Sequence, residues 1–393
     1  MKKSLLSLIL SFLLVGCSTN TSNQPSLVSK NVDGYFHNDE FIFPLNTFTA
    51  LNMYDKEKMN EVFPLFNEMI ISLSKEVDRY HTYDGIVNLK SINDSCGTNQ
   101  KLLLSDELFE ILKLGVELTK LTEGRFNLAL GNLIDLYSDK FSILTNENTL
   151  PDSDSLQNAL LSIPSYEIID EVIVLDESDN SIILNKCNDL NVTISLGALA
   201  KGYVMQKGYD YLKTYENDFF FNSGNSTIGL YGNNPLSTNG YWRIGLFNPT
   251  LSETDEYLAT LSIKGEQYLS TSGDYQQYFF YEDDNNDKKM MNHIIDPFTG
   301  VSNDYLRSVS LISSSCSLGV LDALSTTLFN VKSDEEAKDM IALFEQTYNV
   351  TINYVISKKT SDNNYTDVNL LINEELEDYV YGFATNVKKV EYI

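Results

Sequence analysis

The irregular alternation of strand-like and helix-like segments most constrains how these 393 residues can fold. Residues 242–247 alternate apolar and polar side chains as a strand does, whereas 106–121 have the apolar period of a helix. Ser105 can cap that helix, and Gly124 follows its end. The segments do not keep the strand–helix–strand rhythm of a parallel sheet. We therefore expect an α+β fold.

The same patterns predict most of the remaining elements. Further strands are expected over 41–54, 219–230, 258–263, 306–313, 350–357 and 379–385, and a hairpin over 167–184. Helices are expected over 56–80, 198–215, 318–329 and, after the capping residue Ser333, through 348. The polar run 283–288 is interpreted as a solvated hairpin tip, because it lacks the downstream Gly and Glu of an EF-hand loop.

The N-terminus indicates a compartment. Lys2 and Lys3 precede an apolar run over 5–15 that is too short to span a bilayer. The run ends in Gly16-Cys17, which resembles a bacterial lipoprotein signal, although an ordinary signal peptide with a chance cysteine is the alternative. We expect a signal peptide over 1–16, lipidated Cys17 (palmitate included) at the head of a flexible tether over 17–40, and one domain over 41–393. The protein would then be lipid-anchored on the outer face of a cell membrane, either a Gram-positive surface or a periplasm.

Composition excludes two kinds of partner. Lys and Arg number 28 against 55 Asp and Glu, a formal charge of −27. Nucleic acid and anionic lipid surfaces are both held by clustered basic residues, so neither is an expected partner. With 42% hydrophobic residues the chain can bury a core.

Cysteine usage does not identify a cofactor. Cys96, Cys187 and Cys316 are widely spaced and form no C-x-x-C pair. One disulfide among them and three free thiols are both compatible with the sequence.

Two segments point to anion chemistry. In 193–203 an apolar strand passes through small residues into a helix that carries Lys201 in its first turn. Backbone N–H groups at such a helix start attract anions, although a tight strand–helix packing corner explains the pattern equally well. Residues 269–275 resemble a hydroxyl-rich turn with one carboxylate, Asp274.

Two further segments point to a cation and to proton transfer. Asp322 and Thr326 share one face of a helix at i and i+4, where they offer a carboxylate and a hydroxyl to a hard cation. A polar pair near a helix start is the alternative. His293 precedes the turn sequence Asp-Pro-x-Thr-Gly at 296–300. With only three histidines, a multi-histidine metal site is not expected.

The order of these segments resembles the ApbE family of FAD:protein FMN transferases, which are often bacterial lipoproteins. The resemblance runs from about residue 41 to the C-terminus and includes 78–83, 91–93 and 124–131. It implies a single catalytic unit of mixed, mainly antiparallel sheets with helices, and FAD in a central cleft.

The resemblance also implies residue roles. Magnesium ligands fall on Asp322, Thr326 and the backbone carbonyl of Ala198. His293 and Asp274 fall at positions for proton transfer. Flavin-nucleotide contacts fall on Leu45, Tyr83, Ala129, Leu130, Gly131, Ser195, Lys201 and Ile295.

The implied reaction is Mg²⁺-dependent transfer of FMN from FAD to a threonine hydroxyl, with release of AMP. The acceptor would be a flavoprotein of an extracytoplasmic electron-transfer system. Two alternatives stay open: a Mg²⁺-dependent FAD pyrophosphatase that gives FMN and AMP, and a non-catalytic lipid-anchored flavin-binding protein.

Two departures from the family pattern bear on affinity and rate. Ser195 stands where the family usually has Asp, so a carboxylate contact becomes a hydroxyl contact. Residues 222–225 read Asn-Ser-Gly-Asn, which lacks one glycine and one acid of the family's segment. Neither departure removes a magnesium ligand.

Overall fold

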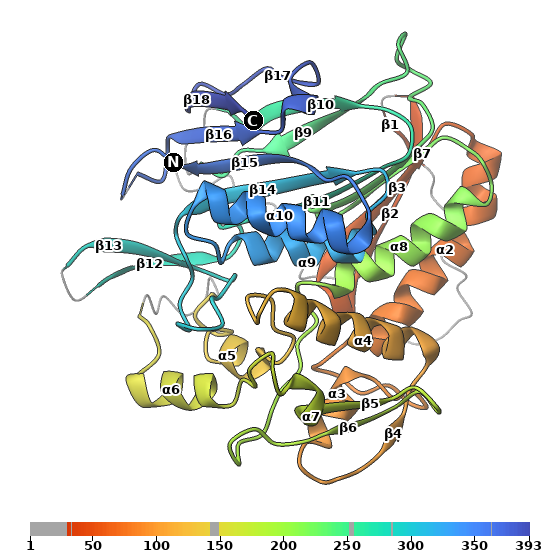
Figure 1. Ribbon diagram of the computed structural model, residues 1–393. Helices are drawn as coiled ribbons and strands as arrows, with labels where there is room; N and C mark the ends of the chain where they lie inside the picture. Colours follow the sequence, from red (N-terminus) through yellow and green to blue (C-terminus); the bar gives the residue numbers. More distant parts are fainter. Residues whose placement is uncertain (1–29, 33, 142–148, 251–254, 284–285, 363) are drawn as a thin grey trace, which may run out of the picture.

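A large central sheet organises the chain. The computed structural model describes residues 30–393 except 33, 142–148, 251–254, 284–285 and 363. Among these residues, ten strands form one sheet in the order β1-β2-β3-β7-β8-β11-β14-β15-β16-β18 (Figure 1). Neighbouring strands are antiparallel except β16 and β18, which are parallel. The expected α+β class with mainly antiparallel sheets is confirmed.

The elements have the following bounds. The central strands are β1 (Lys30–Val32), β2 (Tyr35–Ile42), β3 (Thr47–Met53), β7 (Phe219–Ser223), β8 (Thr227–Tyr231), β11 (Gln267–Gly273), β14 (Leu306–Ser313), β15 (Asn353–Lys359), β16 (Val368–Ile372) and β18 (Val387–Tyr392). Smaller sheets contain β17 (Val380–Tyr381), β10 (Tyr257–Ile263) and β9 (Trp242–Phe247); β12 (Tyr278–Glu282) and β13 (Lys288–Asn292); and β4 (Leu102–Leu103), β6 (Ser181–Leu184) and β5 (Ile173–Asp176). The helices are α2 (Lys56–Glu76), α3 (Leu89–Asp94), α4 (Asp106–Leu121), α5 (Gly131–Asp135), α6 (Ser153–Leu161), α7 (Ile169–Val172), α8 (Ala200–Lys213), α9 (Leu318–Leu328) and α10 (Asp334–Tyr348), with short 3-10 turns η2 (Phe43–Leu45) and η3 (Glu374–Leu376).

The central sheet is covered on both faces. Helices α2, α8 and α9 pack on one face and bury the main apolar cluster, which includes Phe66, Met205 and Leu321. The small sheet of β9, β10 and β17 closes the other face, where Trp242 and Leu258 bury apolar side chains of the central strands. Burial on both faces stabilises the strands beneath helices α8 and α9, where polar side chains converge.

Side-chain caps explain where several helices begin. Ser105 accepts a hydrogen bond from the Leu108 N–H, and Ser333 accepts one from the Glu336 N–H. Both satisfy an N–H that the first helical turn leaves without an intrahelical partner. The predicted bounds of α4 and α10 are confirmed, and α8, α9, β9, β10 and β14 lie within two residues of their predicted ends.

The tether prediction is wrong from residue 30 onward. β1 and β2 lie in the central sheet, and β2 pairs with β3 from Phe36 opposite Met53 to Ile42 opposite Thr47. Residues 41–54 are therefore not one strand, because η2 interrupts them and Asn46 turns the chain with φ 47°. Cys17 and the predicted signal peptide lie outside the described residues.

Four local predictions are also corrected. The hydroxyl-rich segment 269–275 is mostly strand β11 rather than a turn, because it is hydrogen-bonded on both sides by β8 and β14. The hairpin predicted over 167–184 begins only at Ile173, after the short helix α7. The strand predicted over 379–385 is reduced to β17, and α2 ends four residues before position 80.

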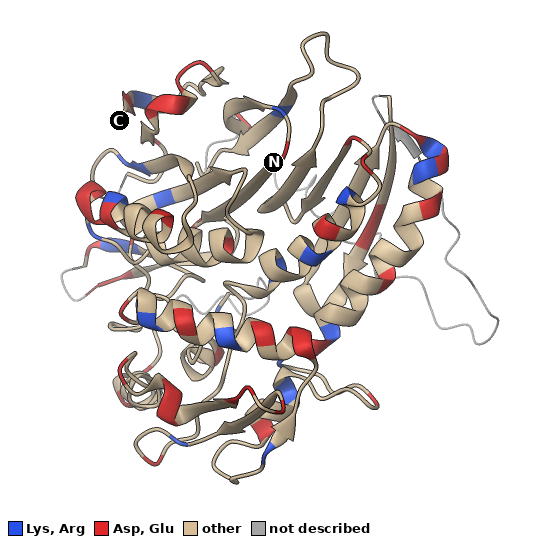
Figure 2. Cartoon of the chain, turned by 45° about the vertical axis from the view of Figure 1, so that its right-hand side comes forward, with Lys and Arg blue, Asp and Glu red and all other residues tan. Residues whose placement is uncertain are grey.

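The surface accounts for the acidic composition. Acidic side chains are scattered over outer helices and loops (Figure 2). Several pair with lysines, as Glu177 in the turn after β5 does with Lys113 on α4. Cys96, Cys187 and Cys316 are buried free thiols, so the free-thiol alternative is confirmed. In the part of the chain that the structure describes, no helix is long and apolar enough to cross a membrane.

Candidate active site

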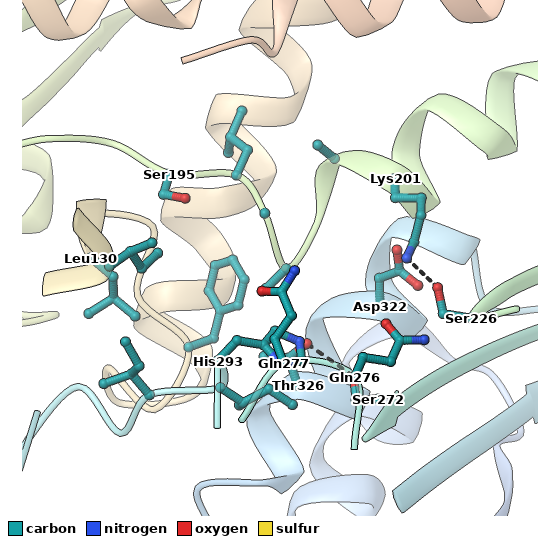
Figure 3. A pocket seen from close by; sticks show the side chains of 18 of the residues that line it. Leu130, Ser195, Lys201, Ser226, Ser272, Gln276, Gln277, His293, Asp322 and Thr326 are labelled. Carbon is teal, nitrogen blue, oxygen red and sulfur yellow. Dashed lines mark hydrogen bonds between the residues drawn. The ribbon is translucent and has the colours of Figure 1, made fainter. Parts of the chain in front are cut away.

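A cavity of about 520 Å³ is lined by residues of α8, α9 and β11 and by residues of α5, which lies in the lower part of Figure 1. Its size falls within the range of small-molecule sites. Several of the predicted site residues line this cavity: Leu45, Leu130, Ser195, Ala198, Lys201, His293, Ile295, Asp322 and Thr326. Figure 3 shows Leu130 and Ser195 on one side, Lys201 and Asp322 on the other, and His293 and Thr326 between them.

Asp322 is the buried carboxylate of the polar side. It is 7% exposed, and its Oδ1 accepts a hydrogen bond from the Ser270 hydroxyl at 2.5 Å. Its Oδ2 accepts from the Gly202 N–H at 2.6 Å. Burial raises the pKa of Asp322, while the neighbouring Lys201 charge and these hydrogen bonds oppose that rise.

Gly202 explains why α8 and α9 approach so closely. A Cβ at this position would lie 2.3 Å from the Leu318 carbonyl oxygen and 2.8 Å from the Asp322 carboxyl carbon. Only glycine therefore lets the α8 backbone donate directly to Asp322. The small residues of 193–203 thus provide both a packing corner and a polar site, which sequence reasoning treated as alternatives.

Lys201 brings a positive charge to the first turn of α8. Its Nζ donates to the Ser226 Oγ (Figure 3). Burial lowers the pKa of Lys201, and the Asp322 carboxylate opposes that shift. The start of α8 has no side-chain cap. The N–H groups of Ala200 and Gly202 already donate to the Leu196 carbonyl and the Asp322 carboxylate, so the ammonium group of Lys201 and the positive end of the helix dipole are what this corner offers to an anion.

His293 faces the middle of the cavity. Its backbone N–H donates to the Gln277 carbonyl at 3.1 Å, so β13 and the turn after β11 set its place. The side chain is open to the cavity, but the protein around it and the Lys201 charge lower the pKa of His293 to about 4. A neutral imidazole is able to accept a proton at neutral pH.

Apolar side chains also line the cavity, and Leu130 lies on the side opposite Lys201 (Figure 3). They include Leu45, Leu130, Ile134, Phe141 and Ile295. These side chains belong to η2, α5 and the segments beside them. A ligand that fits both sides has an anionic part and a flat or apolar part.

The polar side fits a hard cation in its chemistry. Asp322 supplies a carboxylate and Thr326 a hydroxyl one helical turn later, and Ala198 is also among the residues that line the cavity. Mg²⁺ prefers such oxygen ligands and commonly uses only one or two protein carboxylates. In the described ranges, no three His, Cys, Asp or Glu side chains gather around a metal position. A metal at this place would thus take one carboxylate from the protein.

Four predicted site residues do not line the cavity. Tyr83 instead donates to the Asp78 carboxylate at 2.6 Å, and its neighbour Tyr80 reaches the cavity. Ala129 is buried, and Gly131 packs so tightly that a Cβ would meet the Thr193 carbonyl at 2.5 Å.

Asp274 is the fourth predicted site residue that does not line the cavity. It is 2% exposed and accepts a hydrogen bond from the Arg307 Nε at 2.5 Å. The cavity is lined instead by its neighbours Gly273 and Tyr275. Asp274 therefore anchors this wall through its Oδ2, while its Oδ1 is buried and has no hydrogen-bond partner among the described residues. Its part in proton transfer stays a prediction.

Sequence reasoning missed several lining residues. They include Arg79, Arg125, Asn127, Ser226, Ser270, Ser272, Gln276 and Gln277. The Ser-Thr-Ser run was visible in the sequence, and its alternation as a strand would have placed Ser270 and Ser272 on one face. Arg79 and Arg125 lie in two segments that carry the family resemblance, 78–83 and 124–131, but neither arginine was given a role there.

Fold and site together define a class: an α+β protein with a cavity that both charged and apolar side chains line. A sequence profile of the ApbE family matches residues 45–352. The chain therefore belongs to the ApbE family, as its ordered motifs predicted.

Individual relatives agree with this assignment. The chain is 30% identical to the FAD:protein FMN transferase of Klebsiella pneumoniae (strain 342) over 241 residues, 61% of this chain and 67% of that protein. The ApbE protein of Thermotoga maritima has a similar fold, with a TM-score of 0.66, 20% identity and coverage of 84% of this chain and 97% of that one. The flavin transferase ApbE of Vibrio cholerae gives a TM-score of 0.59 at 19% identity, covering 84% and 94%. The Klebsiella relative is named an FAD:protein FMN transferase and the Vibrio protein a flavin transferase, so this chain is a transferase enzyme.

Proposed function

We propose that this enzyme transfers FMN from FAD to a threonine hydroxyl of an acceptor flavoprotein and releases AMP, in a Mg²⁺-dependent reaction. The observation that carries the proposal is the position of Lys201, Asp322, Thr326 and His293 around one cavity that apolar side chains also line. This arrangement suits a dinucleotide whose pyrophosphate lies at the polar side and whose ring system lies at the apolar side.

The bonds exchanged define what the protein must supply. The threonine oxygen forms a bond to the FMN-side phosphorus, the bond from that phosphorus to the AMP oxygen breaks, and the hydroxyl proton needs an acceptor. Phosphoryl transfer depends on positioning and charge neutralisation more than on covalent help from the enzyme. Mg²⁺ held by Asp322, Thr326 and the Ala198 carbonyl would supply Lewis-acid neutralisation of the pyrophosphate.

The chain's own residues supply the remaining steps. Lys201 and the start of α8 attract the pyrophosphate oxygens. His293 is open to the cavity, and the surrounding protein and the Lys201 charge lower its pKa to about 4, so it is neutral at neutral pH and accepts the hydroxyl proton. The apolar wall excludes water from the ring system and orients the ligand along the cavity.

The decisive experiment uses mature protein, FAD, Mg²⁺ and a candidate acceptor flavoprotein. Covalent flavin on the acceptor and AMP should appear in equal amounts. If AMP forms at the same rate without acceptor and no flavin becomes covalent, the enzyme is an FAD pyrophosphatase. If no AMP forms in either case, the protein only binds flavin.

We further propose that Cys17 is lipidated and holds the enzyme on the extracytoplasmic face of the cell membrane, near its acceptor. The proposal rests on the apolar run before Gly16-Cys17. Metabolic labelling with palmitate should mark the wild type and leave a Cys17→Ser variant unmarked. Labelling that persists in the variant would contradict this assignment.

A further inference from the structure

A chain of hydroxyl groups joins Asp322 to Thr326 along the contact between α9 and β11. The Ser270 Oγ lies 2.5 Å from the Asp322 Oδ1 and 3.1 Å from the Ser325 Oγ. The Ser325 Oγ lies 2.8 Å from the Ser272 Oγ. The Ser272 Oγ lies 3.3 Å from the Thr326 Oγ1, a contact drawn in Figure 3. Four consecutive contacts therefore connect two residues of one helix through a neighbouring strand.

The direction of the protons in this chain follows from counting them. Each hydroxyl carries one hydrogen, and an ionised carboxylate only accepts. Ser270 must therefore donate to Asp322, so Ser325 must donate toward Ser270. By the same step Ser272 donates to Ser325, and Thr326 donates to Ser272. No other assignment makes a hydrogen bond of all four contacts.

Two neighbouring contacts support this direction. The Ser325 Oγ also lies 3.0 Å from the Asp322 backbone carbonyl, which can only accept and therefore competes with Ser270 for the single Ser325 proton. With either acceptor this proton is not given to Ser272, so Ser272 still donates to Ser325 and Thr326 still donates to Ser272. The Gly202 N–H can only donate, and it binds the other carboxylate oxygen at 2.6 Å. The Asp322 end of the chain is thus surrounded by donors, as an ionised acceptor requires.

We propose that Ser270, Ser325 and Ser272 are positioning residues that draw the Thr326 hydroxyl proton away from the cavity and leave its oxygen lone pairs facing a cation. This inference rests on the magnesium site of the proposed function and deepens it. A threonine hydroxyl can point either its proton or its lone pairs at a neighbour. The chain would fix the second orientation before any metal arrives, as outer-shell hydrogen bonds do for other metal ligands.

The test measures metal binding alone, with neither FAD nor acceptor present. Mn²⁺ serves as the probe, and its dissociation constant from the full mature chain is followed by electron paramagnetic resonance. Ser272→Ala and Ser325→Ala interrupt the chain, and each should raise the Mn²⁺ dissociation constant roughly ten-fold. Ser272→Thr keeps the hydroxyl and should restore the affinity.

The matched control is Ser357→Ala. Ser357 and Ser308 form a buried hydroxyl pair at 2.7 Å in the same sheet but outside the chain to Thr326. Its replacement should leave Mn²⁺ affinity unchanged. The Mn²⁺-induced shift in melting temperature is measured for every variant, so loss of folding is seen directly. Ser272 is only partly buried, and its replacement tests the chain even if Ser325→Ala does not fold.

Asp322→Asn separates the two levels of the proposal. If it abolishes Mn²⁺ binding while folded Ser272→Ala binds Mn²⁺ as the wild type does, the positioning chain is wrong and the metal site stands. If Asp322→Asn also binds Mn²⁺ normally, the metal assignment itself is wrong and the chain is wrong with it. Reduced affinity in both serine variants, with rescue by Ser272→Thr, supports the proposal.

Discussion

Two buried carboxylates, Asp322 and Asp274, each lie beside a basic group. They differ in that only Asp322 lines the cavity. Asp322 on α9 lies beside Lys201, lines the cavity and accepts from groups that also face it. Asp274 follows the end of β11 and faces Arg307, which is 0% exposed. The Arg307 guanidinium also donates at 2.5 Å to the backbone carbonyls of Tyr365 and Pro249, so it holds three segments together.

The contrast shows that burial beside a basic group does not by itself identify a functional acid. Burial raises the pKa of Asp274 to about 6 even though Arg307 opposes the shift, and a perturbed acid of this kind often marks an active site. Here its partner is locked into the core, and Asp274 anchors the turn that carries Tyr275 to the cavity. Access to the cavity, rather than the pKa, separates the two residues.

The sharpest way to break the comparison is to remove each charge in turn. Asp322→Asn should lower FMN transfer at saturating Mg²⁺ about a thousand-fold or more, because the metal's neutralisation of charge is lost. Asp274→Asn should keep transfer per folded molecule within about ten-fold, since it removes an anchor and no reacting group. Single-turnover rates, corrected for the folded fraction, measure both. A thousand-fold loss in folded Asp274→Asn would return that residue to the catalytic machinery.

The Asp274–Arg307 pair should matter more for the free energy of unfolding than for the transfer rate. Arg307→Met leaves the Asp274 carboxylate buried without a partner and should lower the free energy of unfolding by about 3–5 kcal/mol. The double variant Asp274→Leu with Arg307→Met removes both charges and should recover much of that loss. Urea unfolding of the single and double variants measures the coupling. Equal losses in the two would contradict the anchoring role.

The pH dependence of the transfer rate tests whether His293 is the proton acceptor. His293→Asn should lower the transfer rate about a hundred-fold, the usual contribution of a general base. Because the surrounding protein and the Lys201 charge lower the pKa of His293 to about 4 from its ordinary 6.5, the acid-side fall in the wild-type rate should lie near pH 4. An acid limb centred at pH 6 to 7 would contradict the assignment.

The lowered pKa of His293 also predicts how the free energy of unfolding depends on pH. Between pH 6.5 and about 4 the unfolded chain binds a proton at His293 that the folded chain does not. His293 therefore destabilises the fold as pH falls through that window, and the loss is complete below the folded pKa. Unfolding free energies of His293→Asn should depend less on pH over this range than those of the wild type.

How much of this could be predicted from the sequence depended on distance along the chain. Asp322 and Thr326 were found because one helical turn relates them, and Lys201 because small residues lead into its helix. The apolar strand expected just before those small residues is wrong, since residues 191–196 form no strand. Ser270 and Ser272 were seen but assigned to a turn, although alternation along a strand would have placed both on one face; in the structure β8 and β14 pair with that strand on either side. Arg307, 33 residues from Asp274, gave no local signal, because its partners come from three separate loops.

The smallest expected effect concerns the apolar side of the cavity. Ser195 lies there, its backbone held by a hydrogen bond from its N–H to the Leu128 carbonyl at 2.8 Å, and it stands where the family usually has Asp. A carboxylate forms a stronger, charge-assisted hydrogen bond to a ligand N–H or O–H than a hydroxyl does. Ser195→Asp should therefore tighten FAD binding about three- to ten-fold with little change in the transfer rate once FAD is saturating. Fluorescence titration of FAD onto the wild type and the variant measures this, with Ser195→Asn as the uncharged control. Weaker binding in Ser195→Asp than in Ser195→Asn would show that a negative charge is unfavourable here, and that the serine is an adaptation of this chain rather than a lost contact.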